Sequence, residues 1–273
     1  MSPICSDKSL WQFDLFEPFC KNITNFVTSR HGGYSEGNYA TFNPSPYSGD
    51  DVQTVEKNLD KLKASLPQRP KALFRPRQVH GIEMQCIDAA FLSLSQEVQE
   101  KRLEGVDAIC TDIRGYAVCV STADCVPILL YDWRHQAVAA IHSGWRGTVQ
   151  HILSLSLQQM NRLYGTEGQD IYAGIGPSIS INAFEIGEEV YDAFEKAGFP
   201  MEQISIWKKS TRKHHIDLWK ANTMQLENFG VPTNQIEVSG ICTFTNNEDF
   251  FSARRLGINS GRILSGIMIN PSV

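Results

Sequence analysis

The chain has 273 residues, of which 42% are hydrophobic and 20% charged, so it is long enough to bury a large core. Its formal net charge of −5, without a dense run of Lys or Arg, argues against nucleic acid as a partner. The start, MSPICSDKSLWQF, has no secretory-signal pattern, and no apolar run is long enough to span a bilayer. We therefore expect a cytoplasmic protein with no membrane partner. Seven cysteines without a close CxxC spacing predict neither a disulfide framework nor a zinc ribbon.

Segments with strand character recur along the chain, because they are rich in Val, Ile and aromatic residues and are bounded by Gly, Asp, Pro or Arg. In chain order they are 22–30, 71–80, 82–88, 106–112, 116–122, 126–132, 136–142, 170–176 and 263–269. Helices are predicted at 52–66, 147–165, 187–199 and 217–230. The pattern is clearest in 147–165, where Ile152, Leu155, Met160 and Leu163 can share one apolar face.

The order of these elements predicts the fold class. Four strand-like pieces follow one another between residues 106 and 142 with short connections, which favours antiparallel or mixed pairing. No linker, low-complexity tract or repeat divides the chain. We predict an α+β fold: a single domain, 1–273, of mixed, largely antiparallel sheets with helices packed outside. The Gly-, Asn-, Pro- and Ser-rich segment 31–51 is expected to be a long ordered loop, the kind of segment that often carries function.

Three potential ligands lie at strand ends: His80, Cys125 and His142. If they converge, they form a His2Cys set, which suits zinc and leaves a fourth position open, as catalytic sites require. Asp124 and the backbone around Ser143 and Gly144 would then be natural hydrogen-bonding partners of the ligands.

Other interpretations of the same residues stay open. From spacing alone, an unreactive buried Cys125 beside two structural histidines is favoured. Cys125 as a nucleophile with a histidine base is a second interpretation, although Asp124 would raise the pKa of a free thiol beside it. A blue-copper centre is a third, but a multicopper oxidase needs many more histidines than the seven present, which include no HxH pair.

Arginines near glycines and aromatic residues indicate an anionic ligand. Arg30, Arg146, Arg254 and Arg255 are placed this way, and planar guanidinium groups suit bidentate contacts to phosphate. Neither a P-loop nor a GxGxxG pattern is present.

Five motifs together resemble those of one family. QVHG, TADCVPILLYD, AAIHSGWRGT, GIGPSIS with AFEIGEEV, and CTFTNNEDFFSARRLG followed by GR are similar to the YfiH type of protein, also called laccase-domain or polyphenol oxidase proteins. The resemblance extends from about residue 28 to the C-terminus. It implies a zinc-containing purine nucleoside phosphorylase with adenosine deaminase activity, whose metal ligands fall on His80, Cys125 and His142.

The resemblance also implies ligands and site residues. Purine nucleosides (adenosine, inosine and methylthioadenosine) and inorganic phosphate are the expected partners, and we expect a monomer or a weak homodimer. Expected catalytic residues are Cys125, Asp124 and Glu185, and expected substrate-binding residues are Arg30, Phe42, Asn43, Arg146 and Arg254. The chain departs from the family pattern at Pro44-Ser45 and at Leu59, which puts a purine contact from the helix in doubt. The competing hypotheses are a copper-dependent polyphenol oxidase and a binding protein with a structural zinc.

Overall fold

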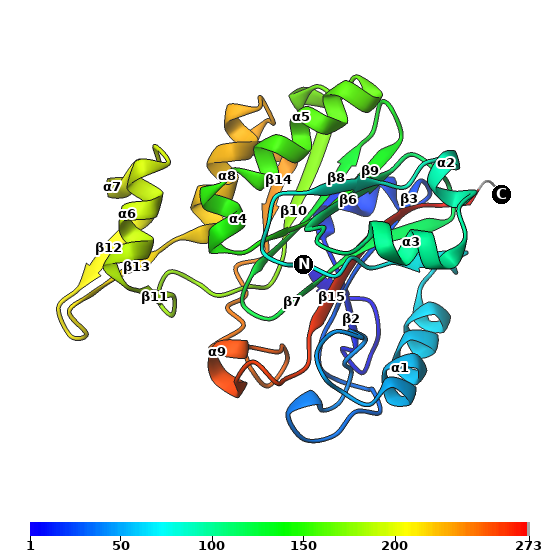
Figure 1. Ribbon diagram of the computed structural model, residues 1–273, viewed down its shortest axis with the longest axis horizontal. Helices are drawn as coiled ribbons and strands as arrows, with labels where there is room; N and C mark the ends of the chain where they lie inside the picture. Colours follow the sequence, from blue (N-terminus) through cyan, green and yellow to red (C-terminus); the bar gives the residue numbers. More distant parts are fainter. Residues whose placement is uncertain (272–273) are drawn as a thin grey trace.

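The computed structural model describes residues 1–271 and contains two six-stranded sheets packed face to face (Figure 1). The first sheet has the order β1-β2-β3-β15-β7-β4. Its strands are β1 (Ser2–Pro3), β2 (Leu10–Gln12), β3 (Ile23–Thr28), β4 (Ala72–Phe74), β7 (Tyr116–Thr122) and β15 (Ile263–Ile269).

The second sheet has the order β14-β10-β8-β9-β6-β5. Its strands are β5 (Met84–Cys86), β6 (Ala108–Thr111), β8 (Val126–Asp132), β9 (Ala137–Ser143), β10 (Ile171–Ile175) and β14 (Ile236–Val238). Most strand pairs are antiparallel, while β4–β7, β5–β6 and β10–β14 are parallel. The mixed, largely antiparallel character predicted from the sequence is thus confirmed.

A small third sheet, β11-β13-β12, projects from the body together with two helices (Figure 1). Its strands are β11 (Glu185–Ile186), β12 (Ser205–Lys208) and β13 (Lys213–Ile216). The α-helices are α1 (Val52–Ser65), α2 (Ala89–Leu92), α3 (Gln96–Arg102), α4 (Trp145–Val149), α5 (Ile152–Tyr164), α6 (Glu188–Lys196), α7 (Met201–Ile204), α8 (Leu218–Asn228) and α9 (Ala253–Leu256). Short 3-10 helices are η1 (Asp14–Phe19), η2 (Gly37–Tyr39), η3 (Gly168–Asp170) and η4 (Thr233–Gln235).

Successive side chains of the central strands point to opposite faces of each sheet, and the hydrophobic core is therefore divided into three layers. On β8, Leu129 and Tyr131 point between the two sheets, whereas Ile128 and Leu130 face the helices. The outer face of the second sheet is covered by helices that include α5 and α8, and the outer face of the first sheet by α1 (Figure 1). The helices therefore pack outside the sheets, as predicted.

The prediction of one continuous helix over 147–165 is wrong, because the structure divides this segment into α4 and α5. His151 separates them with φ 60° and ψ 38°, a left-handed conformation that cannot continue a helix. The predicted apolar face also needs correction. Ile152 and Met160 are buried, but Leu155 and Leu163 are 36% and 43% exposed, and the buried face runs instead through Leu153 and Leu157.

Within residues 1–271, none of the helices combines the length and the apolar character needed to cross a bilayer. The segment 31–51 forms an ordered loop whose only regular element is η2, and two of its residues reach the pocket described next.

Candidate active site

The structure brings His80, Cys125 and His142 together where the chain passes from one sheet to the other. His80 follows β4, Cys125 lies between β7 of the first sheet and β8 of the second, and His142 lies on β9 opposite Pro127. Their ligand atoms lie within 4.8 Å of one another, and the two imidazole centroids are 4.9 Å apart. One thiolate and two imidazoles at this spacing fit a divalent zinc-type ion with a position left open.

Asp107, which directly precedes β6, organises two of these ligands. Its fully buried carboxylate lies 2.7 Å from Nδ1 of His142, so that Nδ1 is directed to the carboxylate and Nε2 is left for the cluster. The same carboxylate accepts hydrogen bonds from the backbone amides of Val79, His80 and Gly81, at 3.1, 2.9 and 2.8 Å. These bonds hold His80 in its left-handed conformation, φ 63°.

The ionisable groups of the cluster shift one another's pKa values toward the charged forms. Burial raises the pKa of the Cys125 thiol, but the imidazoles of His142 and His80 lower it to about 6. Burial lowers the pKa of His142, whereas Cys125 and Asp107 raise it to about 9. Cys125 is therefore prepared as a thiolate, which is the form that binds metal.

Gly144 is required beside the cluster because a side chain would occupy the same space. A Cβ atom at this position would lie 2.9 Å from Sγ of Cys125 and 3.1 Å from Cδ2 of His80. The backbone of Gly144, with φ −69° and ψ 172°, is accessible to any residue, so the requirement comes from space and not from conformation.

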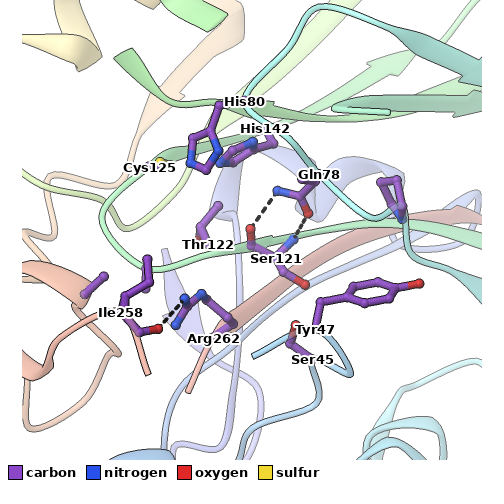
Figure 2. Close-up of a pocket in the computed structure, with 13 residues that line it drawn as sticks. Ser45, Tyr47, Gln78, His80, Ser121, Thr122, Cys125, His142, Ile258 and Arg262 are labelled. Carbon is purple, nitrogen blue, oxygen red and sulfur yellow. Dashed lines mark hydrogen bonds between the residues drawn. The ribbon is translucent and has the colours of Figure 1, made fainter. Parts of the chain in front are cut away.

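The three residues lie on the wall of a pocket of about 190 Å³, several times the volume of one water molecule, so it has room for an organic ligand (Figure 2). The other lining residues come from four segments: Ser45 and Tyr47; Pro76 and Gln78; Ser121, Thr122 and Ala123; and Ala253, Ile258 and Arg262. In Figure 2 the two imidazoles and Cys125 lie together, and Arg262 and Tyr47 lie across the pocket from them.

Two polar side chains fix the pocket walls. Gln78 makes a reciprocal pair of hydrogen bonds with the backbone of Ser121, 2.8 and 2.7 Å long, which fastens the His80 segment to the end of β7 (Figure 2). Arg262 is half-buried and donates to the carbonyls of Ile258, Ser260 and Gly261. Burial lowers the pKa of Arg262, while the nearby Cys125 and Asp124 raise it.

The two carboxylates predicted as catalytic acids are in different surroundings. Asp124, at φ 87°, immediately precedes Cys125, and its carboxylate accepts from Oγ1 of Thr243 and from the amide of Arg254, both at 2.7 Å. It therefore connects the cluster to two C-terminal segments. Glu185 pairs with Nζ of Lys213 at 2.8 Å, which lowers the pKa of Glu185, and it is not among the pocket-lining residues.

The five residues predicted to bind substrate do not line the pocket, and most have other contacts. Phe42 is fully buried, and its ring belongs to the hydrophobic cluster beneath α1. It is therefore a core residue. Asn43 is also fully buried; its side-chain oxygen accepts from the amides of Ser45 and Arg262, and so connects two walls of the pocket.

The three predicted arginines lie elsewhere as well. The guanidinium of Arg30 donates to the carbonyls of Ala40 and Asn247, at 2.9 and 2.6 Å. Arg146 is exposed and lies over the ring of Trp145, 4.3 Å from its centroid. Arg254 is exposed and donates to the carbonyl of Glu185.

Sequence reasoning missed Asp107, Gln78 and Arg262. Gln78 and Arg262 lie within the motifs QVHG and GR, where a signal was present. Asp107 carries no such signal, because it precedes an ordinary buried strand and meets His142, 35 residues later, only through sheet pairing.

The fold and this cluster define a protein of mixed, largely antiparallel sheets and helices, with an open set of one thiolate and two imidazoles that could hold a metal ion. The family model described as "Multi-copper polyphenol oxidoreductase laccase" matches residues 24–270. The chain belongs to this family, as its motifs predicted, and the family is one of enzymes.

Relatives extend over nearly the whole chain. A protein from Bacteroides thetaiotaomicron named purine nucleoside phosphorylase is 52% identical, covering 99% of this chain and 100% of its own length. Adenosine deaminase RL5, from an unknown prokaryotic organism, is 40% identical over 92% of this chain and 96% of its own length. The crystal structure of YlmD from Geobacillus stearothermophilus has a TM-score of 0.84 at 30% identity, covering 93% of this chain and 94% of that one. That of Bacillus licheniformis YfiH has a TM-score of 0.86 at 25% identity, covering 96% and 97%.

Proposed function

We propose that this protein is a zinc-dependent purine nucleoside phosphorylase. It acts on adenosine, inosine and methylthioadenosine, releases the free base and ribose 1-phosphate, and deaminates adenosine as a second activity. The observation that carries the proposal is the cluster of His80, Cys125 and His142 opening into a pocket whose far side carries Arg262. Two relatives support the two reactions by their names: the Bacteroides thetaiotaomicron protein is named purine nucleoside phosphorylase, and RL5 is named adenosine deaminase.

His80, Cys125 and His142 would hold the zinc ion, with Asp107 orienting His142. When bound there, zinc supplies Lewis acidity at an open coordination position. The donor set supports zinc, since thiolate and imidazole are ligands that it prefers, and Cys125 is prepared as a thiolate by its two histidine neighbours.

In phosphorolysis, an oxygen of inorganic phosphate attacks the anomeric carbon of the ribose while the purine leaves. The protein has to position the nucleophile and balance its charge. Among the pocket-lining residues Arg262 is the permanent cation, and its bonds to three backbone carbonyls keep it at the pocket wall. We assign phosphate to Arg262, in place of the exposed Arg146 and Arg254.

In deamination, water replaces the amino group at the six-position of the purine, so a proton carrier is needed. Neither predicted acid is among the pocket-lining residues. Asp124 is the candidate, since it directly precedes Cys125 and is held by Thr243 and the Arg254 amide. Glu185 is the weaker candidate, because its carboxylate is paired with Lys213 and no ligand of the cluster is next to it in the chain.

A copper-dependent polyphenol oxidase is the second candidate, favoured by the description of the family. The histidine inventory opposes it. Within residues 1–271, His80 and His142 are the only two histidines that share a cluster of potential metal ligands, whereas a trinuclear copper centre needs many. The pocket lining also contains no Met to serve as an axial copper ligand.

Product analysis after incubation with adenosine, with and without phosphate, tests the proposal. We expect adenine and ribose 1-phosphate only when phosphate is present, and inosine in both cases. Oxygen uptake with a phenolic substrate, dependent on added copper and accompanied by no nucleoside turnover, would establish the oxidase instead.

A further inference from the structure

A second group of potential metal ligands lies at the opposite end of β8. Asp132 ends this strand, His135 lies in the turn to β9, and Asp170 immediately precedes β10. Ile171 pairs with Asp132 across the two strands, and this brings the carboxylates together. Asp132 follows Cys125 by seven residues, so at about 3.3 Å per residue this cluster is roughly 20 Å from the candidate active site.

The three residues, called here the Asp132 cluster, contain two buried acids. The side chains of Asp132 and Asp170 are 0% and 2% exposed, and a ligand atom from each residue of the cluster lies within 4.8 Å of the others. Oδ1 of Asp132 accepts from the amides of Arg134 and His135, which holds the turn. Oδ2 of Asp132 is 2.8 Å from Nδ1 of His135.

Asp170 is incompletely partnered. Its Oδ1 pairs with Nε of Arg134 at 3.1 Å, but the Arg134 side chain is 57% exposed, and water screens much of this attraction. Its Oδ2 is buried and has no hydrogen-bond partner among residues 1–271. A buried carboxylate oxygen without a donor is unfavourable unless a cation or another donor meets it.

We propose that the Asp132 cluster binds a divalent cation through Asp132, His135 and Asp170. Such an ion would neutralise the two carboxylates and give the unpartnered oxygen of Asp170 a ligand role. The 2.8 Å between Oδ2 of Asp132 and Nδ1 of His135 is close to the separation of roughly 3 Å between adjacent ligands bound at about 2.1 Å in octahedral geometry. The cation replaces the hydrogen on Nδ1 of His135: a neutral imidazole then carries its proton on Nε2 instead, and an imidazolium releases one proton to solvent.

Two carboxylates and one imidazole select a harder ion than the thiolate-containing active site does. Carboxylate and water ligands suit Mn²⁺, and imidazole extends the preference to other first-row divalent ions. Mn²⁺ is therefore a suitable probe, because it has little preference for the Cys125 thiolate.

The experiment titrates Mn²⁺ into metal-stripped, full-length Cys125→Ser protein and follows the free aqueous ion by electron paramagnetic resonance. We expect one bound Mn²⁺ per chain. Loss of a direct ligand in Asp170→Asn or His135→Gln should lower the affinity at least tenfold, since loss of a residue that only orients a ligand already costs about 10- to 100-fold. Asp112→Asn, at an exposed acid outside the cluster, is the matched control and should bind as the parent does.

Binding weaker than about 1 mM, the weak limit of protein cation sites, would overturn the proposal. So would equal affinity in Asp170→Asn and its parent. His135 is partly exposed, so His135→Gln keeps the test valid if Asp170→Asn fails to fold, which thermal unfolding of each variant reveals. In the wild-type background, Asp170→Asn should retain nucleoside turnover, so this outcome is independent of the proposed function.

Discussion

At the scale of residues, Asp107 is the most informative position, because one buried carboxylate orients His142 and fixes the loop of His80. His80 is in a conformation that is unfavourable without these hydrogen bonds, since its φ is positive. The candidate centre is thus preorganised by a residue that is not itself among the pocket-lining residues.

Asp107→Asn should weaken zinc binding by about 10- to 100-fold, because an amide group presents hydrogens to the backbone N–H donors and to His142. A competition titration with a chromophoric chelator measures this affinity. Asp112→Asn, an exposed acid, should leave it unchanged. Equal zinc affinity in Asp107→Asn and wild type would show that the Asp107 carboxylate is not needed to orient the zinc ligands.

Arg262→Gln should raise the KM for phosphate by at least about tenfold, since a charge-assisted contact contributes roughly 1.5–3 kcal/mol, and should change the KM for inosine far less. Initial rates with each substrate varied in turn separate the two constants. Arg146→Gln, at an exposed site outside the pocket, is the control. If Arg146→Gln raised the phosphate KM and Arg262→Gln did not, the assignment would be reversed.

At the scale of elements, the long helix predicted over 147–165 shows what the sequence pattern lacks. His151 breaks it because of contacts from another part of the chain: its ring stacks on Phe199, 5.0 Å away at 10°, and its Nε2 lies 3.2 Å from the carbonyl oxygen of Ala197. Such contacts override helix propensity and leave no local signal. Because α5 contains several leucines, the spacing of apolar residues in the sequence did not show which leucines are buried.

Leu157→Ala should lower the free energy of unfolding by about 2–5 kcal/mol, because it leaves a cavity against the second sheet. Leu155→Ala, on the exposed side of the same helix, is the matched control, with an expected change of about 0.5 kcal/mol. Urea unfolding of both variants measures the difference. Similar losses would contradict the orientation of α5.

At the scale of the whole molecule, the sequence predicted the central architecture well. The long buried strands β7, β8, β9 and β15 were identifiable because each is a run of mostly apolar residues. The short strands β4, β5 and β6 lie within predicted segments, but β1, β11 and β14, of two or three residues, were missed because so short a segment shows no period. The ligand set was visible at three strand ends, whereas the pocket walls depend on segments joined only in the folded chain, as Gln78 and Ser121 are.

Removal of zinc by a chelator should abolish nucleoside turnover and leave the protein folded. None of the three apolar cores contains His80, Cys125 or His142, so we expect the sheets to stay packed without a metal. Circular dichroism and a cooperative thermal transition of the stripped protein measure folding, and added zinc should restore activity. A structural zinc in a binding protein predicts the opposite: unfolding on chelation and no turnover at any stage.

Cys125→Ala shows whether the cluster of His80, Cys125 and His142 is a catalytic zinc centre, when it is compared with wild type for zinc content and for phosphate-dependent release of hypoxanthine from inosine. We expect about one zinc per chain in the active site of wild type, loss of that zinc in the variant, and no hypoxanthine from the variant under conditions where wild type turns over. Full phosphorolysis by Cys125→Ala would show that the enzyme does not depend on a metal held by Cys125.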